Sequence, residues 1–127
     1  MSLRGRILLV DDDHEIVAFL ATLLSLEGFE PRVVTRGSEL FADLGREPAD
    51  LILMDVAMPD VDGIELCRRV KEDPRTKNVP VFIVSARPGG EIVDRARGAG
   101  ADEVIRKPFE NQDLVDLIRR RLEGPAA

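Results

Sequence analysis

The stretch ILLVDDDHEI, residues 7–16, joins large apolar residues directly to three consecutive carboxylates, Asp11, Asp12 and Asp13. A short, almost uniformly apolar run is typical of a β-strand that is covered on both faces. Two like unit charges about 4 Å apart repel by roughly 4 kcal/mol near a protein surface, so the acidic residues need compensation. The stretch therefore predicts a buried strand that ends in a charged cluster, and it raises the question of what neutralises that cluster.

Four further apolar runs follow along the chain. Together with the first, the predicted strands cover residues 6–10, 31–34, 50–54, 79–84 and 103–105. Apolar residues recur at helical spacing after each run; Gly28 is expected to end the first of five helices, and the second is expected to end near Gly45. This alternation favours a doubly wound α/β fold, with a five-stranded parallel sheet between two layers of helices.

The composition is that of one globular domain, which we expect to span residues 1–127 with its core at about 6–122. Hydrophobic residues make up 44% of the chain and charged residues 33%, and the net charge is −6. The negative charge argues against direct nucleic-acid binding, and no apolar run is long enough to span a membrane. The single cysteine, Cys67, cannot form an intramolecular disulfide, which favours a cytoplasmic protein.

Polar side chains follow four of the five predicted strands. The first strand is followed by Asp11, Asp12 and Asp13, the third by Asp55, the fourth by Ser85 and the fifth by Lys107. The carboxyl ends of parallel strands meet at one edge of the sheet, where ligands bind in such folds. Mg²⁺ is bound by a few carboxylates together with water and phosphate oxygens. The pattern thus predicts a magnesium site at that edge.

Each of these residues also has an ordinary structural interpretation. Asp12 or Asp13 could cap the following helix, and we expect Asp13 to do so. Asp55 and Ser85 could belong to turns, and Lys107 could lie at the surface. Suitable residue types at four strand ends are harder to explain in this way, so the joint pattern favours a functional site.

Five segments carry a resemblance to a known family: LLVDDD (8–13), DLILMDVAMPDVDG (50–63), VPVFIVSA (79–86), GADEVIRKPF (100–109) and DLVDLIRRRL (113–122). In this order and spacing, the chain resembles the receiver domain of bacterial two-component response regulators and is similar to the single-domain chemotaxis type. The resemblance implies a flavodoxin-like sheet with the strand order 2-1-3-4-5.

The resemblance implies that Asp55 accepts a phosphoryl group from a sensor histidine kinase or a phosphotransfer protein. It also implies that Mg²⁺ binds the carboxylates of Asp11, Asp12 and Asp55 and the backbone carbonyl of Ala57. We expect no enzyme activity other than the chain's own phosphorylation and dephosphorylation.

Three further residues would contact the phosphoryl group in this family: Ser85, Ala86 and Lys107. The Lys107 ammonium would neutralise negative charge, and the Ser85 hydroxyl would donate a hydrogen bond to a phosphoryl oxygen. The Lys107–Pro108 bond resembles the family's cis peptide, which aims the lysine at the site.

The chain departs from the family at positions that matter for switching. Val104 stands where an aromatic residue is usual, so activation by a swinging ring is not expected, and the loop 86–90 is expected to move instead. Ala57 and Arg87 are expected to prolong the life of the phosphorylated state. The usual partner face of the family, formed by the fourth helix, fifth strand and fifth helix, would allow a homodimer.

Two other functions fit parts of the pattern. In a haloacid-dehalogenase-type phosphatase, Asp11 would be the nucleophile and Asp13 the acid/base, but the chain lacks the further acidic pair and the room for a cap domain. A docking module that is never phosphorylated would be expected to lose the acceptor aspartate or the lysine, and both are present.

Overall fold

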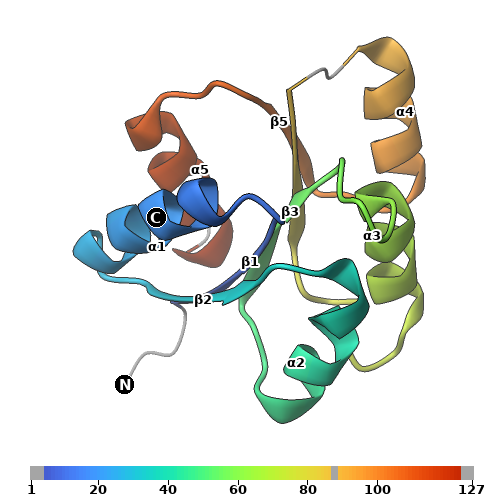
Figure 1. Cartoon of the computed structure of the whole chain (residues 1–127), viewed down its shortest axis with the longest axis horizontal. Coiled ribbons are helices and arrows are strands. Elements are labelled where there is room, and N and C mark those ends of the chain that lie inside the picture. Colours follow the sequence, from blue (N-terminus) through green and yellow to red (C-terminus); the bar gives the residue numbers. More distant parts are fainter. Residues whose placement is uncertain (1–4, 87–88, 124–127) are drawn as a thin grey trace.

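The computed structural model describes residues 5–86 and 89–123, which form one sheet flanked by helices (Figure 1). The strands are β1 (Arg6–Val10), β2 (Glu30–Val34), β3 (Leu51–Asp55), β4 (Val81–Ser85) and β5 (Glu103–Arg106). The helices are α1 (His14–Leu26), the 3₁₀ helix η1 (Gly37–Glu39), α2 (Leu40–Arg46), α3 (Gly63–Glu72), α4 (Gly90–Gly98) and α5 (Asn111–Glu123).

All strand pairs are parallel, and the strand order is β2-β1-β3-β4-β5. The predicted fold class, a flavodoxin-like doubly wound sheet with five α-helices, is therefore confirmed. The strand order reverses at β1, which pairs with β2 on one side and with β3 on the other. In open α/β sheets, ligands bind beyond the carboxyl ends of the strands at such a reversal.

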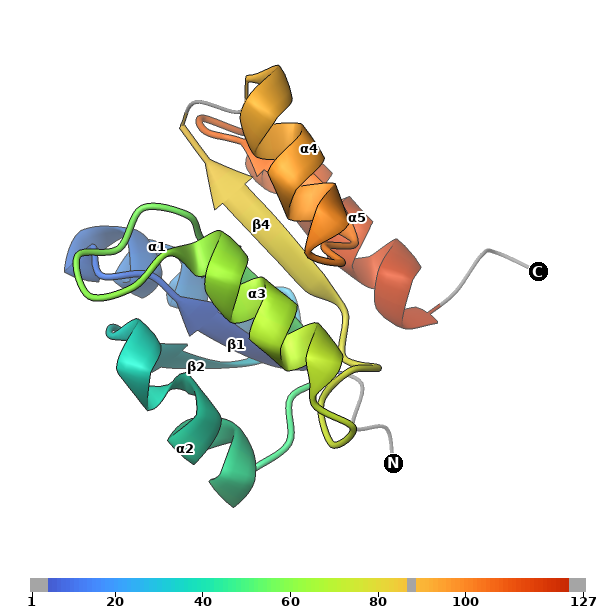
Figure 2. The same ribbon diagram turned by 90° about the vertical axis from the view of Figure 1, so that its right-hand side faces the viewer.

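The sheet is buried on both faces because successive side chains of a strand point to opposite sides. Leu8 and Val10 of β1 pack with α2, α3 and α4 in one core, whereas Ile7 and Leu9 pack with α1 and α5 in the other. Figures 1 and 2 show the two helical layers on opposite faces of the sheet. The almost uniformly apolar sequences of β1, β3 and β4 follow directly from this double burial.

The observed element bounds differ from the predicted ones where single residues act locally. Gly28 follows α1 with a φ of 94°, as a helix-ending glycine should. Helix α2 ends at Arg46, one residue beyond Gly45 and so close to the expected end. The fourth strand begins at Val81 rather than residue 79, because Pro80 has no N–H for the ladder and contributes only its carbonyl, which accepts from Ile52.

Within the described part of the chain, none of the helices combines the length and the apolar character needed to cross a membrane.

Candidate functional site

Three carboxylates converge at the carboxyl end of the sheet. Asp11 directly follows β1, and Asp55 is the last residue of the neighbouring β3. Asp11 is only 7% exposed, and its Oδ1 accepts a hydrogen bond from the backbone N–H of Asp13 over 3.0 Å. Carboxylate oxygens of Asp11, Asp12 and Asp55 lie within 4.8 Å of one another. The fold thus brings together three of the residues that the sequence predicts as metal ligands.

Lys107 projects into this carboxylate cluster from the end of β5. Its Nζ lies 3.2 Å from Oδ1 of Asp55 and 3.3 Å from Oδ2 of Asp11. The Lys107–Pro108 peptide bond is cis, as expected, and the Lys107 N–H donates to the carbonyl of Ser85 over 2.8 Å. The backbone of Lys107 is therefore held at the end of β4, and its side chain reaches across β4 to Asp55.

The cluster changes the proton affinities of its members. Burial, together with the charge of Asp11, raises the pKa of Asp55 above its usual value, although Lys107 acts in the opposite direction. Burial acts to lower the pKa of Lys107, but the charges of Asp11 and Asp55 outweigh it and raise that pKa. Lys107 is therefore cationic, whereas ionisation of Asp55 is less favourable in the folded protein than in the unfolded chain.

The donor set fits a hard divalent cation. All three side chains offer carboxylate oxygens, which are the ligands that Mg²⁺ prefers. Lys107 supplies one positive charge to a cluster of three carboxylates, so the cluster keeps an excess of negative charge that a cation would compensate. Ala57, the fourth predicted ligand, lies in the loop directly after Asp55, where its backbone forms an isolated bridge with Asp62.

The loop that follows Asp55 is closed tightly by Gly63. The Gly63 N–H donates to the carbonyl of Val56 over 3.0 Å. A Cβ atom on Gly63 would lie 2.1 Å from the Asp55 carbonyl oxygen, so only glycine lets α3 begin this close to the end of β3. Gly63 thus permits a tight turn from β3 into α3.

A family model described as the response regulator receiver domain matches residues 7–119. The chain belongs to this family. The Transcriptional regulatory protein CpxR homolog of Haemophilus influenzae is 40% identical over 125 residues, which cover 97% of this chain and 52% of that protein. The Transcriptional regulatory protein GltR of Pseudomonas aeruginosa is 41% identical, with 96% and 51% covered. The receiver domain thus spans about half the length of these curated relatives.

Solved structures of receiver domains have the same fold. A CheY-like response regulator receiver domain protein from Methanospirillum hungatei matches with a TM-score of 0.89 and 31% identity, covering 96% of this chain and 95% of that one. The signal receiver domain of a histidine kinase from Syntrophus aciditrophicus matches with a TM-score of 0.88 and 33% identity, covering 94% and 91%.

The other predicted residues that the structure describes lie at the end of β4 and within β5. Ser85 ends β4 and is 6% exposed, and Ala86 follows it at the surface. Val104 lies in β5, partly buried against the core that α4 helps to form. Arg87 and residue 88 of the loop 86–90 lie outside the described residues, so the expectations for Arg87 and for movement of this loop stay predictions.

Asp13 serves as the cap that the sequence predicts. Its side chain accepts hydrogen bonds from the backbone N–H groups of Glu15 and Ile16 at the start of α1, over 3.0 and 3.2 Å. A side chain engaged in this way is poorly suited to the acid/base role that a haloacid-dehalogenase-type phosphatase needs. Together with the family assignment, this contact removes support for the phosphatase alternative.

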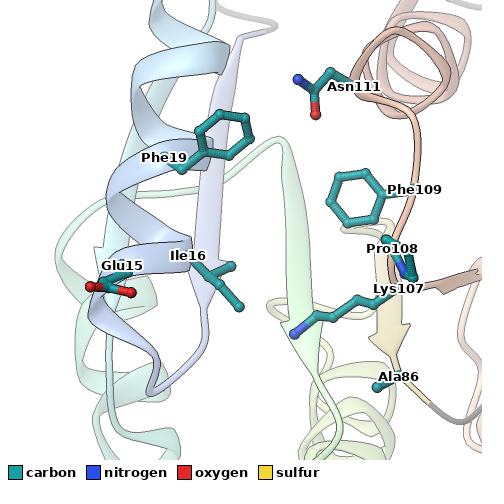
Figure 3. A pocket seen from close by; sticks show the side chains of 8 residues that line it. All are labelled: Glu15, Ile16, Phe19, Ala86, Lys107, Pro108, Phe109 and Asn111. Carbon is teal, nitrogen blue, oxygen red and sulfur yellow. The ribbon is translucent and has the colours of Figure 1, made fainter.

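An apolar groove of about 480 Å³ opens beside Lys107, between α1 and the segment that joins β5 to α5. Figure 3 shows Phe19 and Ile16 on the α1 side, with Phe109 and Pro108 across from them. Sequence reasoning did not identify this groove. The spacing of Phe19 with Ile16 and Leu23 is that of a buried helix face, so only the structure reveals that Phe19 is 53% exposed.

Proposed function

We propose that this receiver domain accepts a phosphoryl group on Asp55 from a sensor histidine kinase or a phosphotransfer protein. The observation that best supports the proposal is the Lys107 ammonium, which contacts Asp55 and Asp11 at once, in a cluster that also includes Asp12. The acceptor and the lysine are both present and in contact, which argues against a module that only docks.

The transfer would join a carboxylate oxygen of Asp55 to phosphorus and break the phosphorus–nitrogen bond of a phosphohistidine. The histidine nitrogen leaves with the electron pair and takes up a proton from water. Both reactants are anionic, so positioning and charge neutralisation are the main requirements. Lys107 holds a positive charge beside the acceptor oxygen, while the Ser85 hydroxyl and the backbone of Ala86 contact phosphoryl oxygens from the end of β4.

Incubation with acetyl phosphate and Mg²⁺ tests this proposal without a partner protein. The chain should gain one phosphoryl group by intact mass, hydroxylamine should remove it as from any acyl phosphate, and peptide mapping should assign it to Asp55. Stable labelling of a serine or of another aspartate would contradict the assignment. We propose no chemistry for this chain beyond gaining and losing this group.

The metal ligands that we propose are the carboxylates of Asp11, Asp12 and Asp55 and the carbonyl of Ala57. Mg²⁺ bound there would supply the positive charge that the carboxylate cluster and the incoming phosphoryl group still lack. Asp12 is the best residue for a test, because it is more exposed than Asp11 and has no contact with Lys107 among the described hydrogen bonds.

We expect Asp12→Asn to weaken Mg²⁺ binding at least about tenfold, because a ligand charge is lost from the site. Calorimetry is the suitable measurement, since the chain has neither tryptophan nor tyrosine to report binding. The matched control is Asp13→Asn, which removes the adjacent charge while asparagine still caps α1. Equal losses of affinity in both variants would show a general charge effect and not a ligand role for Asp12.

We propose that the phosphodonor protein docks on the apolar groove beside Lys107. The groove adjoins the acceptor site through Lys107 itself, so a partner seated there would bring a phosphohistidine close to Asp55. Aromatic residues, phenylalanine included, are enriched in protein interfaces, and Phe19 is 53% exposed in the unbound chain.

Phe19→Ala should slow phosphotransfer from a histidine kinase about tenfold, which corresponds to about 1.4 kcal/mol of lost binding. Phosphorylation by acetyl phosphate should not change, because the small donor does not need the groove. The control is Leu26→Ala, which truncates an 81% exposed residue of the same helix that lies outside the groove. A panel of autophosphorylated histidine kinases is screened for the one that phosphorylates the wild-type chain fastest. If that kinase phosphorylates Phe19→Ala at an unchanged rate, the docking site is refuted.

A homodimer through α4, β5 and α5 stays a prediction. Three arginines of these elements already pair within the chain: Arg95 with Asp62, Arg119 with Glu27 and Arg121 with Asp102. Sedimentation of the phosphorylated and unphosphorylated protein would test whether phosphorylation promotes association.

A further inference from the structure

The loop between β3 and α3 is tied to its surroundings by two carboxylates outside the acceptor cluster. Asp60 accepts hydrogen bonds from the backbone N–H groups of Gly37 and Ser38 in η1, over 3.2 and 3.0 Å. Asp62 forms an ion pair with Arg95 of α4, with 2.7 Å between Oδ2 and the guanidinium. The loop that leaves the acceptor strand is thus attached to a helix on the same face of the sheet.

Asp62 is in turn linked closely to the acceptor strand. Its backbone bridges to Ala57, and its Oδ1 caps α3 by accepting from the N–H of Ile64 over 2.9 Å. The next residue, Gly63, packs directly against the carbonyl of Asp55. A rearrangement at Asp55 or Ala57 therefore reaches Asp62 through backbone contacts, with no flexible side chain between them.

Apart from this ion pair, few contacts anchor helix α4 to the rest of the domain. Ala96 is its only buried residue, and its N-cap, Gly89, makes no side-chain capping bond. Among the described residues, the contact of Arg95 with Asp62 is the only ion pair between α4 and another element. A helix with so little anchoring responds readily to the gain or loss of one fixed contact.

We propose that the ion pair between Asp62 and Arg95 couples the Asp55 site to α4, a proposal that rests on the proposed function. Phosphorylation of Asp55 fixes the loop from Ala57 to Asp62, the fixed Asp62 carboxylate holds Arg95 more firmly, and α4 opens less often. Val104 has no ring, so a swinging aromatic side chain in β5 does not connect the site to this face. Because coupling is reciprocal, a contact that stabilises α4 also favours the phosphorylated arrangement of the loop.

Hydrogen exchange of α4, residues 90–98, tests the coupling with acetyl phosphate and Mg²⁺ in excess during labelling. In the wild type, phosphorylation should slow the hydrogen exchange of α4 about threefold. The expected effect is small because a partly exposed ion pair contributes little to stability. Arg95→Gln and Asp62→Asn should lose this slowing, although asparagine still caps α3. Arg95→Lys should keep part of it, and Arg97→Gln, which changes an exposed arginine of the same helix, should keep all of it.

Persistent slowing in both Arg95→Gln and Asp62→Asn would overturn the coupling, and so would an equal loss in Arg97→Gln. Failure of the proposed function would look different, because intact mass would then show no phosphoryl group on the wild type. If the wild type gains no phosphoryl group, a double-mutant cycle of Arg95→Gln and Asp62→Asn on the unphosphorylated protein still tests the link between Asp62 and α4. Each single variant should speed the exchange of α4, and the double variant should add nothing further; additive effects would refute the link.

Discussion

Asp55→Asn should abolish phosphorylation by acetyl phosphate and leave a protein that is at least as stable as the wild type. The loss is complete because the amide is not a nucleophile toward phosphorus, and Asp11, the other carboxylate that Lys107 contacts, is only 7% exposed and accepts a hydrogen bond from the N–H of Asp13. Intact mass measures the loss, and Asp94→Asn, an exposed aspartate of α4, is the matched control. Undiminished labelling of the Asp55→Asn variant would contradict the acceptor assignment.

The difference in stability between Asp55→Asn and the wild type should be present at neutral pH and should disappear in acid. The pKa of Asp55 is raised by burial and by Asp11, so the folded protein binds this proton more tightly than the unfolded chain does. The contribution of Asp55 to stability is therefore fully present below the ordinary aspartate pKa of about 4 and is lost as the pH rises through the raised value. At neutral pH without Mg²⁺, Asp55→Asn should gain on the order of 1 kcal/mol in the free energy of unfolding.

Denaturant unfolding followed by circular dichroism at neutral and at acidic pH measures this effect. The advantage of the variant should disappear as the pH falls toward 4, because the wild-type carboxyl group is then protonated. An advantage that grows at low pH would show that the sign is wrong.

Gly63→Ala should lower the free energy of unfolding by about 2–3 kcal/mol and should also slow phosphorylation. The new Cβ would lie 2.1 Å from the Asp55 carbonyl oxygen and 2.9 Å from the Cα of Val56, both of which are backbone atoms. Backbone cannot turn aside as a flexible side chain can, so α3 or the end of β3 must shift. Either shift moves the acceptor carboxylate relative to Lys107.

The matched control for this substitution is Gly45→Ala. Gly45 lies inside α2 with open space around it, so alanine should raise stability by about 0.5 kcal/mol and leave phosphorylation unchanged. If Gly63→Ala and Gly45→Ala change stability and phosphorylation equally little, the close contact of Gly63 with Asp55 does not hold the Asp55 side chain in place.

Much of the fold and of the acidic cluster follows from the sequence by itself. Apolar runs and helical spacing are local signals, and they predict five strands and five α-helices, with strand ends that differ by one or two residues from the observed ones, as at Pro80, and without the short 3₁₀ helix η1. The carboxyl ends of parallel strands share an edge whatever the side chains are, so Asp11, Asp12 and Asp55 could be expected to meet. Asp13 caps α1 through its nearest neighbours in the chain, which is again local.

Only the tertiary structure decided which side chains touch across the fold. Lys107 meets Asp55 and Asp11 although 52 and 96 residues separate them, and Arg95 meets Asp62 across 33 residues. The groove beside Phe19 likewise depends on how α1 lies against the segment after β5. Such contacts depend on the packing of whole elements and on side-chain rotamers, which residue periodicity does not encode. The sequence therefore determines which groups reach the edge of the sheet, while packing determines their partners there.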